Sequence, residues 1–333
     1  MNWRTRNRKF IVYGLTVFLI VATTINAPGI ISLAYYIRLV PVVNALPAVP
    51  QIKSTDRVLI VAPHPDDETV ACGGLAQAAL QAGAEVSVVF LTSGDGFEWD
   101  VLLSRTPLPE PGKMLELGRK RMSEARNAVA VLGISSKNLY FLGYPDAGLS
   151  HLISSNYTMP LKSRHTGATA VPYSDALSPS ADYTGRNLEK DLQTVIADVN
   201  PSIVLIPSIH DGHPDHRAAS RFMTEALRGR NVSLRRWIVH GGEEWPLPKG
   251  WHTGLPLEPP PRGKHLIWER LDLSTAQVQT KAKAIRCYHS QMELIGRFIA
   301  AFARTNELES QNDPPAESAT SSDFTSSGVS VNG

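Results

Sequence analysis

The chain has 333 residues, of which 43% are hydrophobic and 19% charged, and its formal net charge is +2. This balance is typical of a globular protein with a sizeable core. The Lys and Arg residues are scattered along the chain, so the charge excludes an extended nucleic-acid surface. Cys72 and Cys287 are the only cysteines, too few for a disulfide framework.

The N-terminus has the pattern of a membrane segment. Four basic residues between positions 4 and 9 precede a stretch without any charge, residues 10–37. A helix needs about 20 predominantly apolar residues to span a bilayer, and a basic flank usually stays in the cytoplasm. We therefore expect residues 1–40 to anchor the chain in a membrane, with the remainder outside the cytoplasm.

A cleaved signal peptide is the alternative reading, because residues 25–27 and 43–45 both resemble small-residue cleavage sites. Cleavage there would make the protein a secreted one. Residues 41–50 are Pro-rich and predict an extended linker. The folded domain is expected over residues 51–308, and the Ser- and Thr-rich segment 309–333 is expected to be a disordered tail.

Strand-like and helix-like segments alternate along the domain, which predicts an α/β fold with a mostly parallel sheet flanked by helices. The expected strands are residues 57–62, 85–92, 138–142, 202–207 and 237–240. The expected helices are residues 69–82, 115–132, 188–199 (with Asn187 as N-cap), 214–227 and 274–304. Residues 150–187 show no periodicity, so this long insertion is either functional or disordered.

Two dense clusters of ligand-type residues follow predicted buried strands. The segment 63–68 reads PHPDDE after the first strand, and 210–216 reads HDGHPDH after the fourth. In open parallel sheets, ligands bind beyond the carboxyl ends of the strands, where both loops would lie. We therefore expect the two clusters to meet in one site.

The residue types in these clusters suit a metal. Catalytic zinc usually takes three protein ligands and leaves a fourth position for water. His64, Asp67 and His216 could supply the three ligands. Asp66, next to a ligand, could then take a proton from the attacking water.

The second cluster also contains a candidate electrophile. His213, if protonated, could stabilise a developing oxyanion, and Asp215 could hold that imidazole in orientation. The set describes metal-assisted hydrolysis of an amide or an ester. Taken singly, each cluster also has a structural reading, because carboxylates before a helix commonly act as N-terminal caps. By the same reasoning, Arg121 fits a solvated helix face and Asp146 a turn.

The segments 62–68 (APHPDDE) and 213–216 (HPDH) together resemble the paired signature of the PIG-L/LmbE-like deacetylases. The resemblance covers roughly residues 55–240 and implies a Rossmann-like fold. It also implies removal of acetyl groups from N-acetylglucosaminyl substrates, which include glycosylphosphatidylinositol, mycothiol and bacillithiol precursors and some antibiotics. The implied metal is zinc, with ferrous iron as the alternative.

The same resemblance implies a role for each matching residue. His64, Asp67 and His216 match the metal ligands, Asp66 the general base, His213 with Asp215 the electrophilic pair, and Arg121 and Asp146, more loosely, the substrate contacts. The insertion at 150–187, the Pro-rich stretch near 255–262 and the N-terminal segment depart from the family pattern and leave the substrate open. A zinc hydrolase of another amide or ester, and a non-catalytic carbohydrate-binding protein of the same fold, remain alternatives.

Overall fold

The computed structural model describes residues 3–96, 110–242 and 244–311. Within these residues, seven strands form one sheet in the order β3-β2-β1-β4-β5-β7-β6. The strands are β1 (Arg57–Ala62), β2 (Glu85–Thr92), β3 (Leu139–Tyr144), β4 (Ile203–Pro207), β5 (Ser233–Trp237), β6 (Trp268–Asp272) and β7 (Asn306–Ser310). The first five pair in parallel, and β7 is antiparallel to both of its neighbours. The predicted α/β fold with a mostly parallel sheet is thus confirmed.

The strand order reverses between β1 and β4, and this reversal places the site. From β1 the chain moves outward through β2 to β3, then returns to the other side of β1 with β4 and β5. The loops after β1 and β4 therefore start side by side and lead the chain toward opposite edges of the sheet, which opens a crevice between the two loops. Both clusters of ligand-type residues follow these two strands.

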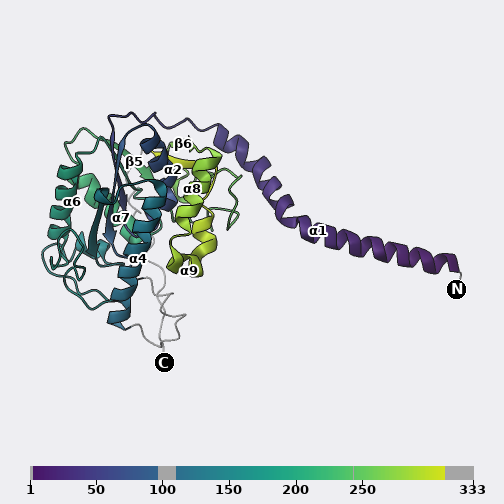
Figure 1. Ribbon diagram of the computed structural model, residues 1–333, viewed down its shortest axis with the longest axis horizontal. Helices are drawn as coiled ribbons and strands as arrows, with labels where there is room; N and C mark the ends of the chain where they lie inside the picture. The colour runs from purple at the N-terminus through teal and green to yellow at the C-terminus, as the bar shows by residue number, and fades with distance from the viewer. Residues whose placement is uncertain (1–2, 97–109, 243, 312–333) are drawn as a thin grey trace, which may run out of the picture.

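Helices cover both faces of the sheet (Figure 1). One layer contains α2 (Asp67–Gln81), α4 (Pro111–Leu132), α8 (Thr275–Ile285) and α9 (His289–Ala300). The other contains α5 (Leu149–Leu152), α6 (Gly185–Val199) and α7 (Pro214–Ala226). The strands β1, β2 and β4 are almost entirely buried between these layers, as unbroken apolar runs in a parallel sheet should be.

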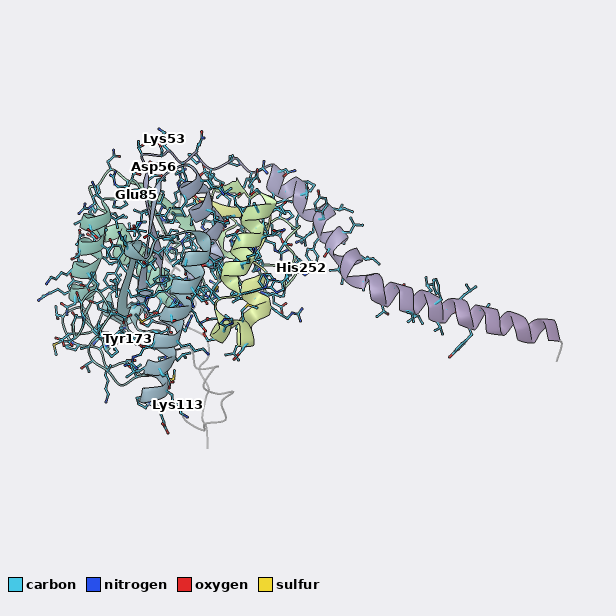
Figure 2. The ribbon with its side chains drawn as sticks, in the orientation of Figure 1. Lys53, Asp56, Glu85, Lys113, Tyr173 and His252 are labelled. Atoms are coloured by element: carbon cyan, nitrogen blue, oxygen red, sulfur yellow. The ribbon has the colours of Figure 1, made fainter. Side chains whose placement is uncertain are left out.

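The insertion at 150–187 is mostly irregular, but it packs as part of the domain. Tyr173 and Tyr183 are fully buried within it, and the Tyr173 hydroxyl donates to Asp95 Oδ2 at 2.6 Å. Figure 2 shows Asp56 and Glu85, which stand at the starts of β1 and β2, at the opposite end of the domain from Tyr173. The insertion therefore lies at the carboxyl edge of the sheet, beside the loops of the site.

Helix α1 (Trp3–Asn44) extends away from the domain (Figure 1). It is held at its C-terminal end, where Leu39 and Val43 are buried and Arg38 pairs with Glu258. His252, which Figure 2 shows on the side of the domain that faces α1, lies 3.2 Å from the Ser32 hydroxyl. The sequence predicts a membrane segment within residues 1–40. Among the residues whose side chains are described, no helix combines the length and the apolar character needed to cross a bilayer.

Several predicted boundaries in the C-terminal half are wrong. The last parallel strand is Ser233–Trp237 rather than 237–240, and the helix expected over 274–304 is two helices followed by strand β7. Strands β6 and β7 have no counterpart among the predicted elements, because their charged side chains conceal the strand pattern. Helix α6 begins at Gly185, with the Thr184 hydroxyl as its N-cap in place of Asn187. The linker expected over 41–50 and the tail expected over 309–333 are both wrong at their first residues, because α1 extends to Asn44 and β7 to Ser310. Residues 312–333 lie outside the described residues.

Candidate active site

The turn after β1 separates the two adjacent aspartates. Asp66 has φ 131° and ψ −32°, a conformation that is strained for any residue with a Cβ. Asp67 begins α2, and its Oδ2 accepts the backbone N–H of His64 at 2.9 Å. Arg121 of α4 braces this turn by donating to the carbonyls of Pro65 and Gly94, each at 2.9 Å. The strained backbone therefore directs the two neighbouring carboxylates to different partners.

The turn after β4 is organised around Asp211, which is completely buried. Its carboxylate accepts the backbone N–H groups of His213, Val239 and His240 at 2.8, 2.8 and 3.1 Å. The same carboxylate lies 3.2 Å from His216 Nδ1. Asp211 thus fixes the loop and orients the His216 ring, so that Nε2 points away from it and toward the first turn.

His213 is the N-cap of α7, where its Nδ1 accepts the backbone N–H of Asp215 at 3.2 Å. An Nδ1 that accepts a hydrogen bond carries no proton, so in the neutral ring the proton sits on Nε2. His213 also lines the cavity described below. Its ring therefore offers a donor without needing a positive charge.

Asp67 joins the two turns. Its Oδ2 lies 3.3 Å from His64 Nδ1 and 3.2 Å from His216 Nε2. Two ligand atoms bound to one tetrahedral zinc at its usual bond lengths lie about 3.3–3.4 Å apart. Both ring nitrogens of His216 are buried and make no hydrogen bond of regular geometry, although Asp211 lies 3.2 Å from Nδ1 and Asp67 3.2 Å from Nε2. Each imidazole thus stands at ligand spacing from Asp67, whereas none of the three-residue ligand groups found among the described residues contains Asp67 itself.

Ligand-type atoms also gather in overlapping sets around this position. Within the described residues, three groups have their ligand atoms within 4.8 Å of one another: His64 with His213 and His216; Asp211 with His216 and His240; His64 with Asp146 and Asp215. All three share a residue with the set that Asp67 joins. The turns after β1 and β4 thus form one continuous centre.

Asp146 and Asp215 both face His64. Asp146 Oδ1 lies 3.2 Å from His64 Nε2, and Asp215 Oδ2 lies 3.5 Å from the same atom. The other Asp215 oxygen accepts the backbone N–H of Leu149 at 3.1 Å. The Asp215 carboxylate therefore supports His64, which differs from the predicted contact with the His213 ring.

A cavity of about 510 Å³ opens above these residues. Its polar side is formed by His64, Asp66, Asp67, Arg121, Asp146, Arg164, His213 and His240. Its apolar side is formed by Val70, Val239, Ile295, Phe298 and Ile299. This size and mixed lining suit a small ligand with one polar and one apolar side.

Burial affects the two neighbouring aspartates differently. Burial raises the pKa of Asp66 to about 7, with Asp67 adding to the rise and Arg121 opposing it at 3.5 Å. For Asp67 burial acts in the same direction, but the His216 and His64 rings hold its pKa well below the usual range. Asp67 is thus the permanent anion and Asp66 the group that can exchange a proton near neutrality.

The pKa values of the His216 and His213 imidazoles also shift in opposite directions. Burial alone would lower the pKa of His216, but Asp211 and Asp67 raise it to about 10. Burial, together with the positive charge of His64 and His216, lowers the pKa of His213 to about 2. His213 is therefore neutral at physiological pH, which differs from the protonated form expected from the sequence.

Sequence reasoning missed two kinds of supporting residue. Asp211 lies two residues before the HPDH segment, and a carboxylate close in sequence to a candidate ligand His is a signal that could have identified it. The contacts of Glu68 have no comparable signal in the sequence. Glu68 accepts the Tyr288 hydroxyl, which comes from a residue 220 positions away, and also receives the backbone N–H of Asp66 at 3.2 Å.

Comparison with known proteins identifies a family whose members resemble this chain. Residues 59–227 match the family model described as PIG-L, GlcNAc-PI de-N-acetylase. A 1D-myo-inositol 2-acetamido-2-deoxy-alpha-D-glucopyranoside deacetylase from Kribbella flavida is 30% identical over 205 residues, which cover 60% of this chain and 62% of that protein. A diacetylchitobiose deacetylase from Thermococcus kodakarensis is 27% identical over 174 residues, covering 51% of this chain and 49% of that protein. The chain thus spans about half to three fifths of the length of these relatives.

A solved structure supports the fold. The crystal structure of the antimicrobial reagent A40926 pseudoaglycone deacetylase matches with a TM-score of 0.50 and 19% identity, covering 79% of this chain and 99% of that one. At this identity the likeness extends to the architecture alone. The family model covers half of the chain and includes both turns of the site. The chain therefore belongs to the PIG-L/LmbE-like deacetylase family.

Proposed function

We propose that the protein is a metal-dependent hydrolase that removes the N-acetyl group from an N-acetylglucosamine-type sugar or glycoconjugate. The observation that carries the proposal is the position of the Asp67 carboxylate, 3.3 Å from His64 and 3.2 Å from His216, with Asp66 in the same cavity. The family and the names of the two relatives support the acetamido sugar as substrate class.

In this proposal His64, Asp67 and His216 hold one divalent cation, zinc or ferrous iron. Such a cation supplies Lewis acidity toward the amide carbonyl and makes water more acidic. Asp211 keeps the His216 ring in orientation through Nδ1, while Asp146 and Asp215 do the same for His64 through Nε2. Carboxylates of this kind orient ligand imidazoles and raise their basicity.

Asp66 is the general base. A base works best when its pKa lies near the working pH, and burial places Asp66 there. Asp66 takes the proton of the water that attacks the acetamide carbon. The same carboxyl then returns a proton to the amine that leaves. The brace from Arg121 to the Pro65 carbonyl keeps the strained turn, and with it the Asp66 carboxylate, in place.

His213 stabilises the oxyanion as a neutral donor. Because its Nδ1 accepts the backbone N–H of Asp215, the neutral His213 ring carries its proton on Nε2 and can donate from that atom. A preorganised donor of this kind needs no charge of its own to lower the energy of a tetrahedral intermediate. Arg121 and Asp146 line the cavity, and we propose that both also contact the substrate.

Acetate release tests the function most simply. The full chain, loaded with zinc or ferrous iron, is incubated with N-acetylglucosamine, diacetylchitobiose and N-acetylglucosaminyl conjugates, and free amine and acetate are measured. We expect the two products in equal amounts. Hydrolysis of esters or peptides alone would favour another metal hydrolase, and sugar binding without turnover would favour a carbohydrate-binding protein.

We further propose that the domain lies outside the cytoplasm, tethered by the N-terminal segment or released after its cleavage. The basic residues between positions 4 and 9 and the uncharged stretch 10–37 support this orientation. A reporter fused after Gly333 should be active outside the cytoplasm. Activity in the cytoplasm alone would contradict the orientation.

A further inference from the structure

A second cavity of about 380 Å³ adjoins the first at His213. We call it the side cavity. The two cavities share His213, His240 and Phe298 in their walls. A substrate whose acetamide group lies beside Asp66 can therefore extend past His213 into the side cavity.

The side cavity has a cationic lining. Among the described residues, the charged side chains that line it are Lys249, Arg262 and the acidic Glu244. Lys249 Nζ donates to the Trp245 carbonyl at 3.3 Å and lies 4.6 Å from the centre of the Phe298 ring. Since Phe298 lines both cavities, the ammonium group stands at the boundary between them.

Arg262 lies where two glycines leave room for its side chain. A Cβ at Gly212 would lie 3.4 Å from Arg262 Nε, and a Cβ at Gly242 would lie 3.3 Å from Arg262 Cγ. Only the Arg262 backbone N–H has a partner there, the Gly241 carbonyl at 3.0 Å. Among the described residues its guanidinium makes no hydrogen bond or ion pair, so the full fork of donors is available to a ligand.

The first turn of α7 adds to the positive potential. Gly212, His213 and Pro214 line the side cavity at the N-terminal end of this 13-residue helix. The aligned peptide dipoles of a helix favour negative charge at that end. The helix alone would not define a site, but here it points in the same direction as two cationic side chains.

From this arrangement we propose that the side cavity binds an anionic group, a phosphate or a carboxylate, on the aglycone of the substrate, with Arg262 and Lys249 as the residues that select it. The proposal rests on the proposed N-deacetylase function and names the part of the substrate beyond the sugar. Arg262 and Lys249 lie outside residues 59–227, the part of the chain that matches the family model. Planar, bidentate recognition of such groups is the property in which Arg exceeds other cations.

The test compares paired N-acetylglucosaminides that differ only in the aglycone: one carries a phosphate, one a carboxylate and one a neutral group of similar size. The measured quantity is the ratio of kcat/KM for each anionic substrate to kcat/KM for the neutral one. Arg262→Gln should lower this ratio about tenfold, mainly through KM, because one charged hydrogen-bonding partner is lost. Lys249→Gln should lower it in the same direction. Lys264→Gln, which removes an exposed charge two residues from Arg262 and outside the cavity lining, is the matched control.

A binding measurement separates this inference from the function on which it rests. Inorganic phosphate is titrated into the metal-loaded full chain and into Arg262→Gln, and binding is followed by calorimetry. We expect weaker binding to the variant and a further loss at high ionic strength. Equal binding by both proteins, or an equal fall of the kcat/KM ratio in Lys264→Gln, would overturn the inference. Loss of phosphate binding in Arg262→Gln without turnover of any N-acetylated sugar would retain the subsite and reject the deacetylase.

Discussion

Asp66 and Asp67 share one turn and one buried environment, and the strain in the backbone is what lets them differ. The φ of 131° at Asp66 turns its carboxylate toward Arg121 and the cavity, while Asp67 stays between two imidazoles. Strain of this kind costs of order 1–3 kcal/mol and persists where the surroundings hold it. Here the braces from Arg121 and Glu68 hold the turn.

The pKa of Asp66 predicts the acidic side of the pH profile. Burial raises this pKa to about 7, so the base is protonated and inactive below that pH and becomes active as the pH rises through it. A bound divalent cation favours the ionised Asp66 carboxylate, so it lowers this pKa and shifts the acidic limb to lower pH. We expect kcat/KM to rise with pH along a limb whose midpoint lies at or below about pH 7 and to level off about one pH unit above that midpoint. An acidic limb that stays in place in Asp66→Asn would assign the limb to another group.

His213 gives a second prediction at the residue scale. His213→Ala should lower kcat about 10²–10³-fold, by analogy with the loss of one oxyanion donor, and should leave the bound metal in place. Because burial and its cationic neighbours keep the pKa of His213 far below neutrality, this ring should produce no basic limb between pH 7 and 9. The exposed His151→Ala is the control. Loss of metal in His213→Ala would make the residue a ligand, which its place among the ligand-type groups allows.

At the scale of elements, the sequence predicts best those strands that are buried on both faces of the sheet. The segments 57–62 and 85–92 are the observed β1 and β2, because strands buried on both faces read as unbroken apolar runs. Both turns of the site are predicted because each comes directly after such a strand. That the two turns lie side by side is predicted because ligands bind at the carboxyl ends of parallel strands.

The missed strands show where this reasoning fails. Strand β7 reads NELES, yet every residue in it is buried. Its Glu307 pairs with the buried Lys281, and its Glu309 lies 3.2 Å from the buried Arg235 of β5. Such partners come from distant parts of the chain, so no local pattern reveals them. The sequence selects Asp215, but its contact with His64, like the Tyr288 contact with Glu68, depends on such distant partners.

Gly185 connects the insertion to helix α6 and allows a direct test of how tightly they pack. A Cβ at this position would lie 2.0 Å from the Leu152 carbonyl oxygen, which belongs to backbone and cannot move aside easily. Gly185→Ala should lower the free energy of unfolding by about 1–3 kcal/mol, as overpacked sites do. Gly112→Ala in α4, where no atom lies within 4 Å of the new Cβ, should leave it nearly unchanged. Equal melting temperatures of the two variants would contradict the packing.

At the scale of the whole molecule, the metal centre joins the two halves of the parallel sheet. His64 and Asp67 follow β1, and His216 follows β4, with about 150 residues of chain between them. An unfolded chain cannot hold these ligands together. Metal binding should therefore stabilise the fold as a whole rather than one loop.

Metal removal tests this coupling. At a free metal concentration about 100 times Kd, binding contributes about 2.7 kcal/mol. For a domain of this size that amounts to a shift in Tm of roughly 5–10 °C. We expect a chelator to lower the Tm of the wild-type protein by this order and to have little effect on His216→Ala. Equal shifts in the two proteins would place the metal elsewhere.

The most direct test of the account measures bound metal and deacetylation rate together in Asp66→Asn and Asp67→Asn. The two substitutions change adjacent residues by the same chemistry, so each is the matched control of the other. We predict that Asp66→Asn keeps about one metal ion per chain and loses about 10²–10⁴-fold in rate, whereas Asp67→Asn loses most of its metal. The opposite pattern, with metal lost from Asp66→Asn and kept by Asp67→Asn, would contradict the assignment of base and ligand. Full activity of Asp66→Asn with its metal retained would contradict the proposed base.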